Sequence, residues 1–137
     1  MVGFPGETEE HHNSLVDFIK EADMLWTGFF PYSQELDTTA YSYDDQIDPE
    51  LALERVRELN RIQDSITQRL LLETIGEKRS VLVDEIGENG RATVRGFDSA
   101  PEIDGVIYVN NAQFAKGEMI EIEITDVLGV DRLAKQI

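Results

Sequence analysis

Residues 97–106 have the sequence Phe-Asp-Ser-Ala-Pro-Glu-Ile-Asp-Gly-Val. Pro101 cannot donate a backbone hydrogen bond to a sheet and Asp104-Gly105 is a strong turn pair, so this stretch is predicted to be a loop. The flanking runs are short, β-branched and separated by Gly, Asn and Asp, which is typical of a small antiparallel barrel; they are residues 81–83, 92–94, 106–109 and 119–124. We therefore predict a compact β module at about residues 77–126, with this loop joining two of its strands.

The N-terminal part of the chain predicts a strand–helix–strand unit. Residues 2–4 end a strand, Gly3-Phe4-Pro5-Gly6 forms a tight turn, and Thr8 caps a helix that ends near Ala22. Residues 25–32 are apolar nearly throughout, which predicts a second strand buried on both faces. Short links make the two strands parallel with a right-handed crossover. Apolar residues at helical spacing mark the buried face of the helix: Leu15, Phe18, Ile19 and Ala22.

A long helix is predicted to follow an irregular polar loop at residues 33–47. Asp48 as N-cap and Pro49 in the first helical position begin it, it runs to about Thr74, and Gly76 ends it. Its buried stripe is expected at Ala52, Val56, Leu59, Ile62, Ile66 and Leu70. Its charged residues are interpreted as a solvent-exposed face: Glu54, Arg55, Arg57, Glu58 and Arg61.

These patterns together predict an α/β part followed by an all-β part. Residues 1–47 form the βαβ piece, residues 48–75 the linking helix, and residues 76–137 the barrel, with hairpin turns at Glu88-Asn89-Gly90 and Lys116-Gly117. Because Val2 enters at once into a strand end without a leading strand, we expect the chain to begin within a larger fold.

Composition narrows the class of partner. The 137 residues include 28 acidic and 12 basic residues, for a net charge of −16. Such a surface is a poor match for a phosphate backbone and a better one for basic proteins or cations. The alternative, that acidity only keeps the chain in solution, is favoured by charge alone.

The residue types that are missing exclude several kinds of chemistry. The chain has no cysteine, which rules out disulfides, thiolate metal sites and thiol nucleophiles within it. No apolar run approaches the length of a membrane span, and the N-terminus lacks a secretion signal. We therefore expect a soluble, cytoplasmic protein that makes no contact with a membrane.

Several motifs, in order along the chain, resemble one enzyme family. The stretch from Val2 to Glu10 is similar to the strand-to-helix signature late in the radical-SAM barrel of methylthiotransferases, and Phe30-Pro31-Tyr32-Ser33 resembles the next barrel strand. The β module resembles a TRAM module, the small OB-like barrel that ends these enzymes. Ala100-Pro101-Glu102-Ile103-Asp104-Gly105 is typical of the branch that modifies an aspartate of ribosomal protein S12. The tRNA-modifying branch usually has a more basic module without this loop.

The chain also departs from the family pattern. Glu35-Leu36-Asp37-Thr38-Thr39-Ala40 stands where the family usually has an acidic-Gly-Thr-Pro-Ala run, and the CxxxCxxC cluster motif is absent. The resemblance implies a parent enzyme that uses S-adenosylmethionine and two 4Fe-4S clusters. This chain resembles roughly the last third of that enzyme, so we predict that it holds no cofactor or metal, has no catalytic residue and is inactive alone.

The resemblance implies two sets of site residues. Gly3, Phe4 and Pro5 would lie beside the S-adenosylmethionine pocket of the parent, whereas in this chain alone a plain strand-to-helix turn is favoured. Asp98, Glu102 and Asp104 have no base or nucleophile nearby, so docking of a basic ribosomal protein is the role implied for them. Turn formation by Asp104-Gly105 is compatible with that role.

Other polar and aromatic residues are given simpler interpretations. His11 and His12 lack the spacing of a helical metal pair and are expected on the surface. Tyrosines 32, 41 and 43 could stack on a ligand but more often pack around a core. Arg91 and Arg95 leave RNA binding as an alternative. A second alternative is a truncated product with no separate role.

Overall fold

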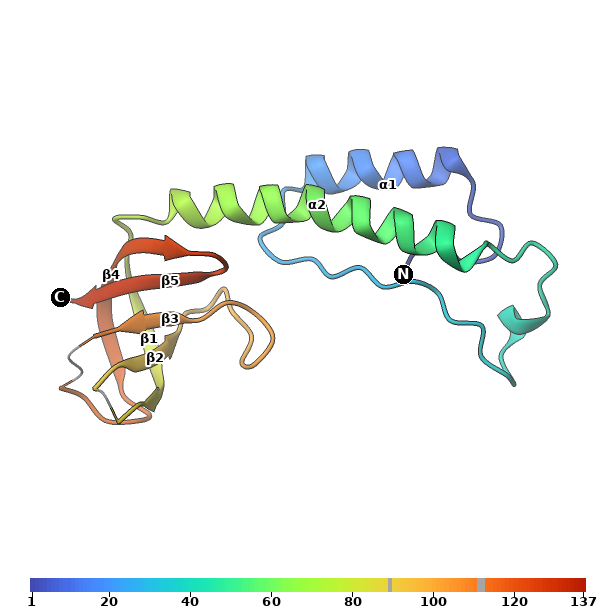
Figure 1. Ribbon diagram of the computed structural model, residues 1–137. Helices are drawn as coiled ribbons and strands as arrows, with labels where there is room; N and C mark the ends of the chain where they lie inside the picture. The colour runs from blue at the N-terminus through green and yellow to red at the C-terminus, as the bar shows by residue number, and fades with distance from the viewer. Residues whose placement is uncertain (89, 111–112) are drawn as a thin grey trace. The chain divides into compact units, whose positions relative to one another are not determined.

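The computed structural model describes residues 1–88, 90–110 and 113–137. The chain forms two compact units, Met1–Thr67 and Gln68–Ile137, and their boundary falls within helix α2, Pro49–Glu73 (Figure 1). Asn89 of the predicted hairpin turn lies outside the described residues; on either side of it, the Gly90 N–H donates to the Gly87 carbonyl over 2.9 Å. Among the described residues, no helix is long and apolar enough to cross a membrane.

Helix α1, Glu9–Ala22, begins and ends where the sequence predicts. The Thr8 hydroxyl accepts from the His11 N–H and His11 Nδ1 accepts from the Thr8 N–H, so the two residues form a reciprocal cap. The predicted buried face is partly wrong, because Phe18 is exposed and the buried residues are His12, Val16 and Ile19. The imidazole of His12 has a partner on α2, because its Nε2 lies 2.9 Å from Glu58 Oε2, and this contact offsets the cost of its burial.

The predicted second strand at residues 25–32 does not form. Only one parallel bridge joins Val2 to Pro31, so the expected direction is right but no ladder follows. Side chains of α2 bind the backbone instead: Gln63 Nε2 donates to the Met24 carbonyl over 2.8 Å, and Thr67 Oγ1 to the Leu25 carbonyl over 2.7 Å. Residues 1–47 contain no sheet, and their assignment to a radical-SAM barrel remains a proposal.

Helix α2 also begins as predicted, because Asp48 Oδ1 accepts from the Glu50 N–H over 2.8 Å. Four residues of the predicted stripe are buried: Ala52, Val56, Leu59 and Ile66. The prediction that Arg55 is solvated is wrong, because its side chain is buried between two carboxylates. The loop before α2 contains a short 3₁₀ helix, η1, Thr39–Ser42, which Gln46 ties by donating from Nε2 to the Ala40 carbonyl.

The second unit is a closed five-stranded barrel with the order β1-β2-β3-β5-β4 (Figure 1). Its strands are β1 Lys78–Ile86, β2 Ala92–Arg95, β3 Ile107–Val109, β4 Met119–Leu128 and β5 Asp131–Gln136. The small OB-like barrel expected from the sequence is therefore present. Two details were wrong: β5 was not predicted, and the barrel is not wholly antiparallel because β3 and β5 run parallel.

The barrel core consists of alternate residues from the strands. Its buried members are mostly β-branched: Val81, Val83, Ala92, Val94, Ile107, Val109, Ile120, Ile122, Ile124 and Ala134. β1 pairs with β4 along its first half and with β2 along its second, with a register shift between Val83 and Glu85. Such a shift bends a strand, which lets one strand border two neighbours around a small barrel.

Candidate functional site

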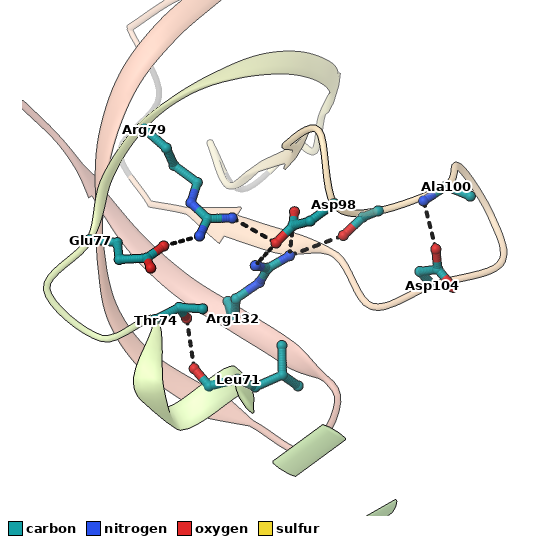
Figure 2. Close-up of polar contacts among 9 residues, drawn as sticks. Leu71, Thr74, Glu77, Arg79, Asp98, Ala100, Asp104 and Arg132 are labelled. Atoms are coloured by element: carbon teal, nitrogen blue, oxygen red, sulfur yellow. Dashed lines mark hydrogen bonds and ion pairs between the residues drawn. The ribbon is translucent and has the colours of Figure 1, made fainter. Parts of the chain in front are cut away.

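Loop 96–106 connects β2 to β3 and is closed by its own polar groups. The Ala100 N–H donates to Asp104 Oδ2 over 2.7 Å (Figure 2). In return, the Asp104 N–H donates to the Ala100 carbonyl over 3.3 Å. At the end of the loop, the Val106 N–H donates to Asp131 Oδ1 over 3.0 Å. The loop is thus tied to itself and to the start of β5, which restricts its conformations.

A cluster of two arginines and one aspartate anchors the start of this loop. Arg132 binds Asp98 through two contacts, Nη1 to Oδ2 at 2.6 Å and Nη2 to Oδ1 at 3.2 Å, and Arg79 Nη1 approaches Oδ2 to 2.7 Å (Figure 2). The side chain of Arg132 is fully buried, and those of Arg79 and Asp98 are 8% and 14% exposed. We call these three residues the Arg–Asp–Arg cluster. Gly96 leaves room for it, because a Cβ there would lie 3.0 Å from an Asp98 carboxylate oxygen.

The charge of the cluster is held by its geometry. Burial by itself would raise the pKa of Asp98, but the hydrogen bonds and positive charges of Arg132 and Arg79 outweigh burial and hold this pKa below the usual value. Glu77 is also paired with Arg79. Together with Glu77, the cluster has two positive and two negative charges, so its charges balance. Because Asp98 belongs to the loop and both arginines belong to the barrel strands, these ion pairs anchor the loop to the barrel.

The three acids predicted to bind a partner do not form one exposed group. Asp98 is largely enclosed by its arginines, and Asp104 is half-buried and accepts a backbone hydrogen bond within the loop. Glu102 is exposed, with a left-handed backbone φ of 63°. The structure thus leaves Glu102 as the most accessible carboxylate of the three.

Sequence reasoning missed the apolar residues of this loop. Phe97 is 90% exposed and Ile103 is 83% exposed. Two hollows lie beside the loop: a notch of about 330 Å³ lined in part by Leu82, Phe97 and Met119, and a groove of about 400 Å³ lined in part by Pro101 and Glu102. The available signal was the presence of two large apolar side chains within a predicted loop.

The other predicted site, the turn at Gly3, Phe4 and Pro5, lies in the first unit. The Glu7 N–H donates to the Phe4 carbonyl over 2.9 Å, so Pro5 and Gly6 occupy the centre of the turn. Glu7 uses both carboxylate oxygens, accepting from the Gly3 N–H over 2.8 Å and from Arg55 Nη1 over 2.7 Å. The Gly3 amide is therefore already bonded within the protein, and a buried arginine of α2 holds the turn.

Aromatic rings surround this turn. Phe4 makes edge-on contacts with Tyr32 and Tyr43, at centroid separations of 5.3 and 6.1 Å. All three rings keep some contact with solvent, and Tyr41 is exposed. Of the two roles predicted for the tyrosines, Tyr32 and Tyr43 pack against Phe4 and remain partly exposed.

The histidines differ from their predicted placement. His11 is exposed and caps α1, as described above, but the prediction that His12 is exposed is wrong. His12 is buried and its Nε2 lies 2.9 Å from Glu58 Oε2. Within the described residues there is no group of three or more His, Asp or Glu side chains that could hold a metal ion.

The two arginines considered for RNA binding lie on or beside β2. Arg91 lies over the ring of Tyr108, with 3.6 Å between its guanidinium carbon and the ring centroid. Arg95 Nε lies 3.1 Å from Asp84 Oδ1. Each arginine is therefore engaged with a neighbouring strand.

Comparison with known proteins agrees with this architecture. The TRAM domain family matches residues 75–137, which contain the whole barrel. The ribosomal protein uS12 methylthiotransferase RimO of Aeromonas salmonicida is 36% identical over 138 residues, covering 100% of this chain and 31% of that protein. Over its whole length this chain is therefore similar to a part of the uS12 methylthiotransferases. RimO of Actinobacillus succinogenes is 41% identical over 128 residues, covering 91% of this chain and 29% of that protein.

The match to these methylthiotransferases is partial in length. The chain spans less than a third of the curated relatives that it matches. Among solved structures, a conserved protein of Methanococcus maripaludis shows 24% sequence identity and a TM-score of 0.37, over 46% of this chain and 79% of that one.

Proposed function

We propose that this chain serves a methylthiotransferase by docking its protein substrate, the ribosomal protein uS12, and that it carries out no catalysis alone. The observation that carries the proposal is the joint presence of a TRAM barrel and strong acidity in a chain related to enzymes named for uS12. An acidic surface attracts a basic ribosomal protein, speeds the encounter and disfavours RNA.

The chemistry of methylthio transfer is assigned to other parts of such an enzyme. The chain has no cysteine, so it offers no thiolate to an iron–sulfur cluster and its residues do not fit that cofactor. For S-adenosylmethionine the proposed wall is Gly3, Phe4 and Pro5. The Gly3 N–H is already bonded to Glu7, so the partly exposed ring of Phe4 is the group that would contact an adenosine.

An RNA-binding barrel is the second candidate, and one observation favours it. The stacked pair of Arg91, directly before β2, and Tyr108 in β3 combines a cation with an aromatic ring, as single-stranded RNA sites do. Against it, residues 76–137 hold 12 acidic and 7 basic residues. The pair is therefore a small basic feature on an acidic barrel.

Titration of the purified chain against uS12 and, separately, against a tRNA stem-loop tests both candidates. We expect binding of uS12 and none of the stem-loop, at about 50 and about 200 mM salt. Binding of RNA alone, with a steep loss of affinity as salt rises, would replace the docking proposal by the RNA-binding one. Methylthio transfer by the chain alone would contradict the proposal that it is not catalytic.

A further inference from the structure

We infer that Phe97 and Ile103 are the apolar contacts through which the barrel binds its basic protein partner, and that Asp98 positions them without contacting the partner. The inference rests on the proposed function and deepens it. It replaces an acidic docking loop by a loop whose centre is apolar and whose surroundings are acidic. That arrangement matches the usual anatomy of a protein interface, with an apolar core and a polar rim.

The exposure of the two side chains is the first argument. Phe97 and Ile103 are 90% and 83% exposed, and both belong to the same short loop. A single exposed apolar residue is ordinary on a protein surface. Two of them on one loop, with a hollow beside Phe97, form a surface whose burial by a partner would be favourable.

The second argument is that the loop is held in place before any partner arrives. Asp98, directly after Phe97, is bound by both arginines of the Arg–Asp–Arg cluster. The same Arg79 guanidinium lies 5.5 Å from the centre of the Phe97 ring. The reciprocal hydrogen bonds of Ala100 and Asp104 close the backbone around Ile103. The backbone of such a loop loses little conformational entropy on binding, which favours affinity.

The third argument is that the hollows offer places for side chains of the partner. The notch beside Phe97 is bordered by Leu82 and the exposed Met119, which suit an apolar side chain. The groove on the Pro101 side is lined by three acidic and two basic residues, so acidic residues are in excess by one; they are Asp84, Glu85, Glu102, Arg95 and Lys116. Arg95 and Ser99 line both hollows, so the two adjoin. An extended polypeptide could place an apolar residue in the first and a Lys or Arg in the second.

The charge of the region selects the kind of partner. Residues 97–106 contain three carboxylates and no basic residue, and the carboxylate of Asp98 is already neutralised by the cluster. Arg79 and Arg132 are themselves enclosed, so they add no positive charge to the surface of the loop. The exposed charge of the loop is therefore negative, which fits a basic polypeptide and opposes a nucleic acid.

Binding of uS12 to the complete chain and to three serine variants tests the inference. Phe97→Ser is expected to weaken binding about 30-fold and Ile103→Ser about 10-fold, in line with losses at central apolar contacts. Leu36→Ser is the matched control, because Leu36 is 71% exposed but lies in the other unit. It is expected to bind within about 2-fold of the unmodified chain. Circular dichroism melts establish that each variant is folded.

Salt dependence separates the apolar contacts from the charged ones. The fold-loss of Phe97→Ser is expected to be equal at about 50 and about 200 mM salt, because an apolar contact is not screened. The loss of Glu102→Gln is expected to be larger at the lower salt concentration. A double-mutant cycle tests the positioning role: Asp98→Asn and Phe97→Ser should give losses that do not add, because Asp98 acts only through the loop that carries Phe97.

The outcomes distinguish the two levels of the proposal. If the unmodified chain binds uS12 and the Phe97 and Ile103 variants bind like Leu36→Ser, the apolar-contact inference is overturned and the docking proposal stands. If Asp98→Asn and Phe97→Ser are fully additive, the positioning role of Asp98 is overturned. If the unmodified chain does not bind uS12, the docking proposal fails and this inference fails with it.

Discussion

Replacing Asp98 by Asn is expected to destabilise the barrel, because it removes the charge that two enclosed guanidinium groups share. Arg132 is fully buried and Arg79 nearly so, and the two make three contacts with this carboxylate. Removing one partner of a buried ion pair costs about 3 to 5 kcal/mol. The asparagine keeps one oxygen that can accept from one guanidinium, so we expect about 3 kcal/mol, at the lower end of this range.

Native-state hydrogen exchange of the barrel amides, read by mass spectrometry, measures this loss directly. Where exchange follows the opening equilibrium, about 3 kcal/mol corresponds to exchange faster by about 150-fold. Asp104→Asn is the matched control in the same loop. Asp104 accepts one backbone hydrogen bond, which an asparagine oxygen can also accept. The loss of stability in Asp104→Asn is therefore expected to stay below about 1 kcal/mol, which corresponds to exchange faster by no more than about 5-fold.

The comparison of these two variants can refute the reasoning. If Asp98→Asn exchanged no faster than Asp104→Asn, the Arg–Asp–Arg cluster would be screened by solvent despite its burial. The view that it anchors loop 96–106 would then be wrong.

Three further predictions concern single groups. Because the pKa of Asp98 is lowered in the folded protein, its contribution to stability is complete above the unfolded value of about 3.9 and is lost as pH falls through the folded pKa. Urea unfolding followed by circular dichroism should therefore show that the free energy of unfolding falls more steeply below about pH 4 in the unmodified chain than in Asp98→Asn. Parallel curves for the two proteins would contradict this. Glu7→Gln should lower the free energy of unfolding by about 3 kcal/mol and Glu9→Gln by less than about 1 kcal/mol. Both carboxylates contact the guanidinium of Arg55, but the Glu7 side chain is 14% exposed and that of Glu9 is 73% exposed. Equal midpoints in unfolding monitored by tryptophan fluorescence would show that burial does not decide the difference. By the same assay, Gly3→Ala should lower the free energy of unfolding by about 2 to 4 kcal/mol. The backbone φ at Gly3 is +76°, and the new Cβ would lie 2.5 Å from the Cβ of Ala52. An unchanged midpoint would mean that the turn relaxes freely.

The side-chain positions change the docking proposal from a contact made by charge alone to one with an apolar centre. A sequence with three acids in one loop suggested a purely electrostatic contact. The structure divides the roles, with Asp98 inside the anchor, Asp104 in the turn, and Glu102 beside exposed apolar groups. An apolar centre would give specificity that charge alone lacks, since many ribosomal proteins are basic.

Features that depend on near neighbours were predictable from the sequence. The cap at Thr8, the helix start at Asp48 and Pro49, and the stop before Gly76 depend on groups only a few residues apart. Four of the five barrel strands and the loop between β2 and β3 followed from β-branched runs and turn residues. These signals sufficed for four strands of the barrel and for the region of the candidate site.

Only the tertiary structure decided which charged residues are buried. Arg132 is inside because Asp98, 34 residues away in sequence, accepts its charge, and for this reason the mixed polar run of β5 was not predicted as a strand. His12 and Arg55 are buried for the same reason, with partners 46 and 48 residues away. A sequence pattern counts each of these residues as polar and therefore exposed. Burial of a charge depends on a partner that the fold brings close, and no periodicity along the chain encodes that partner.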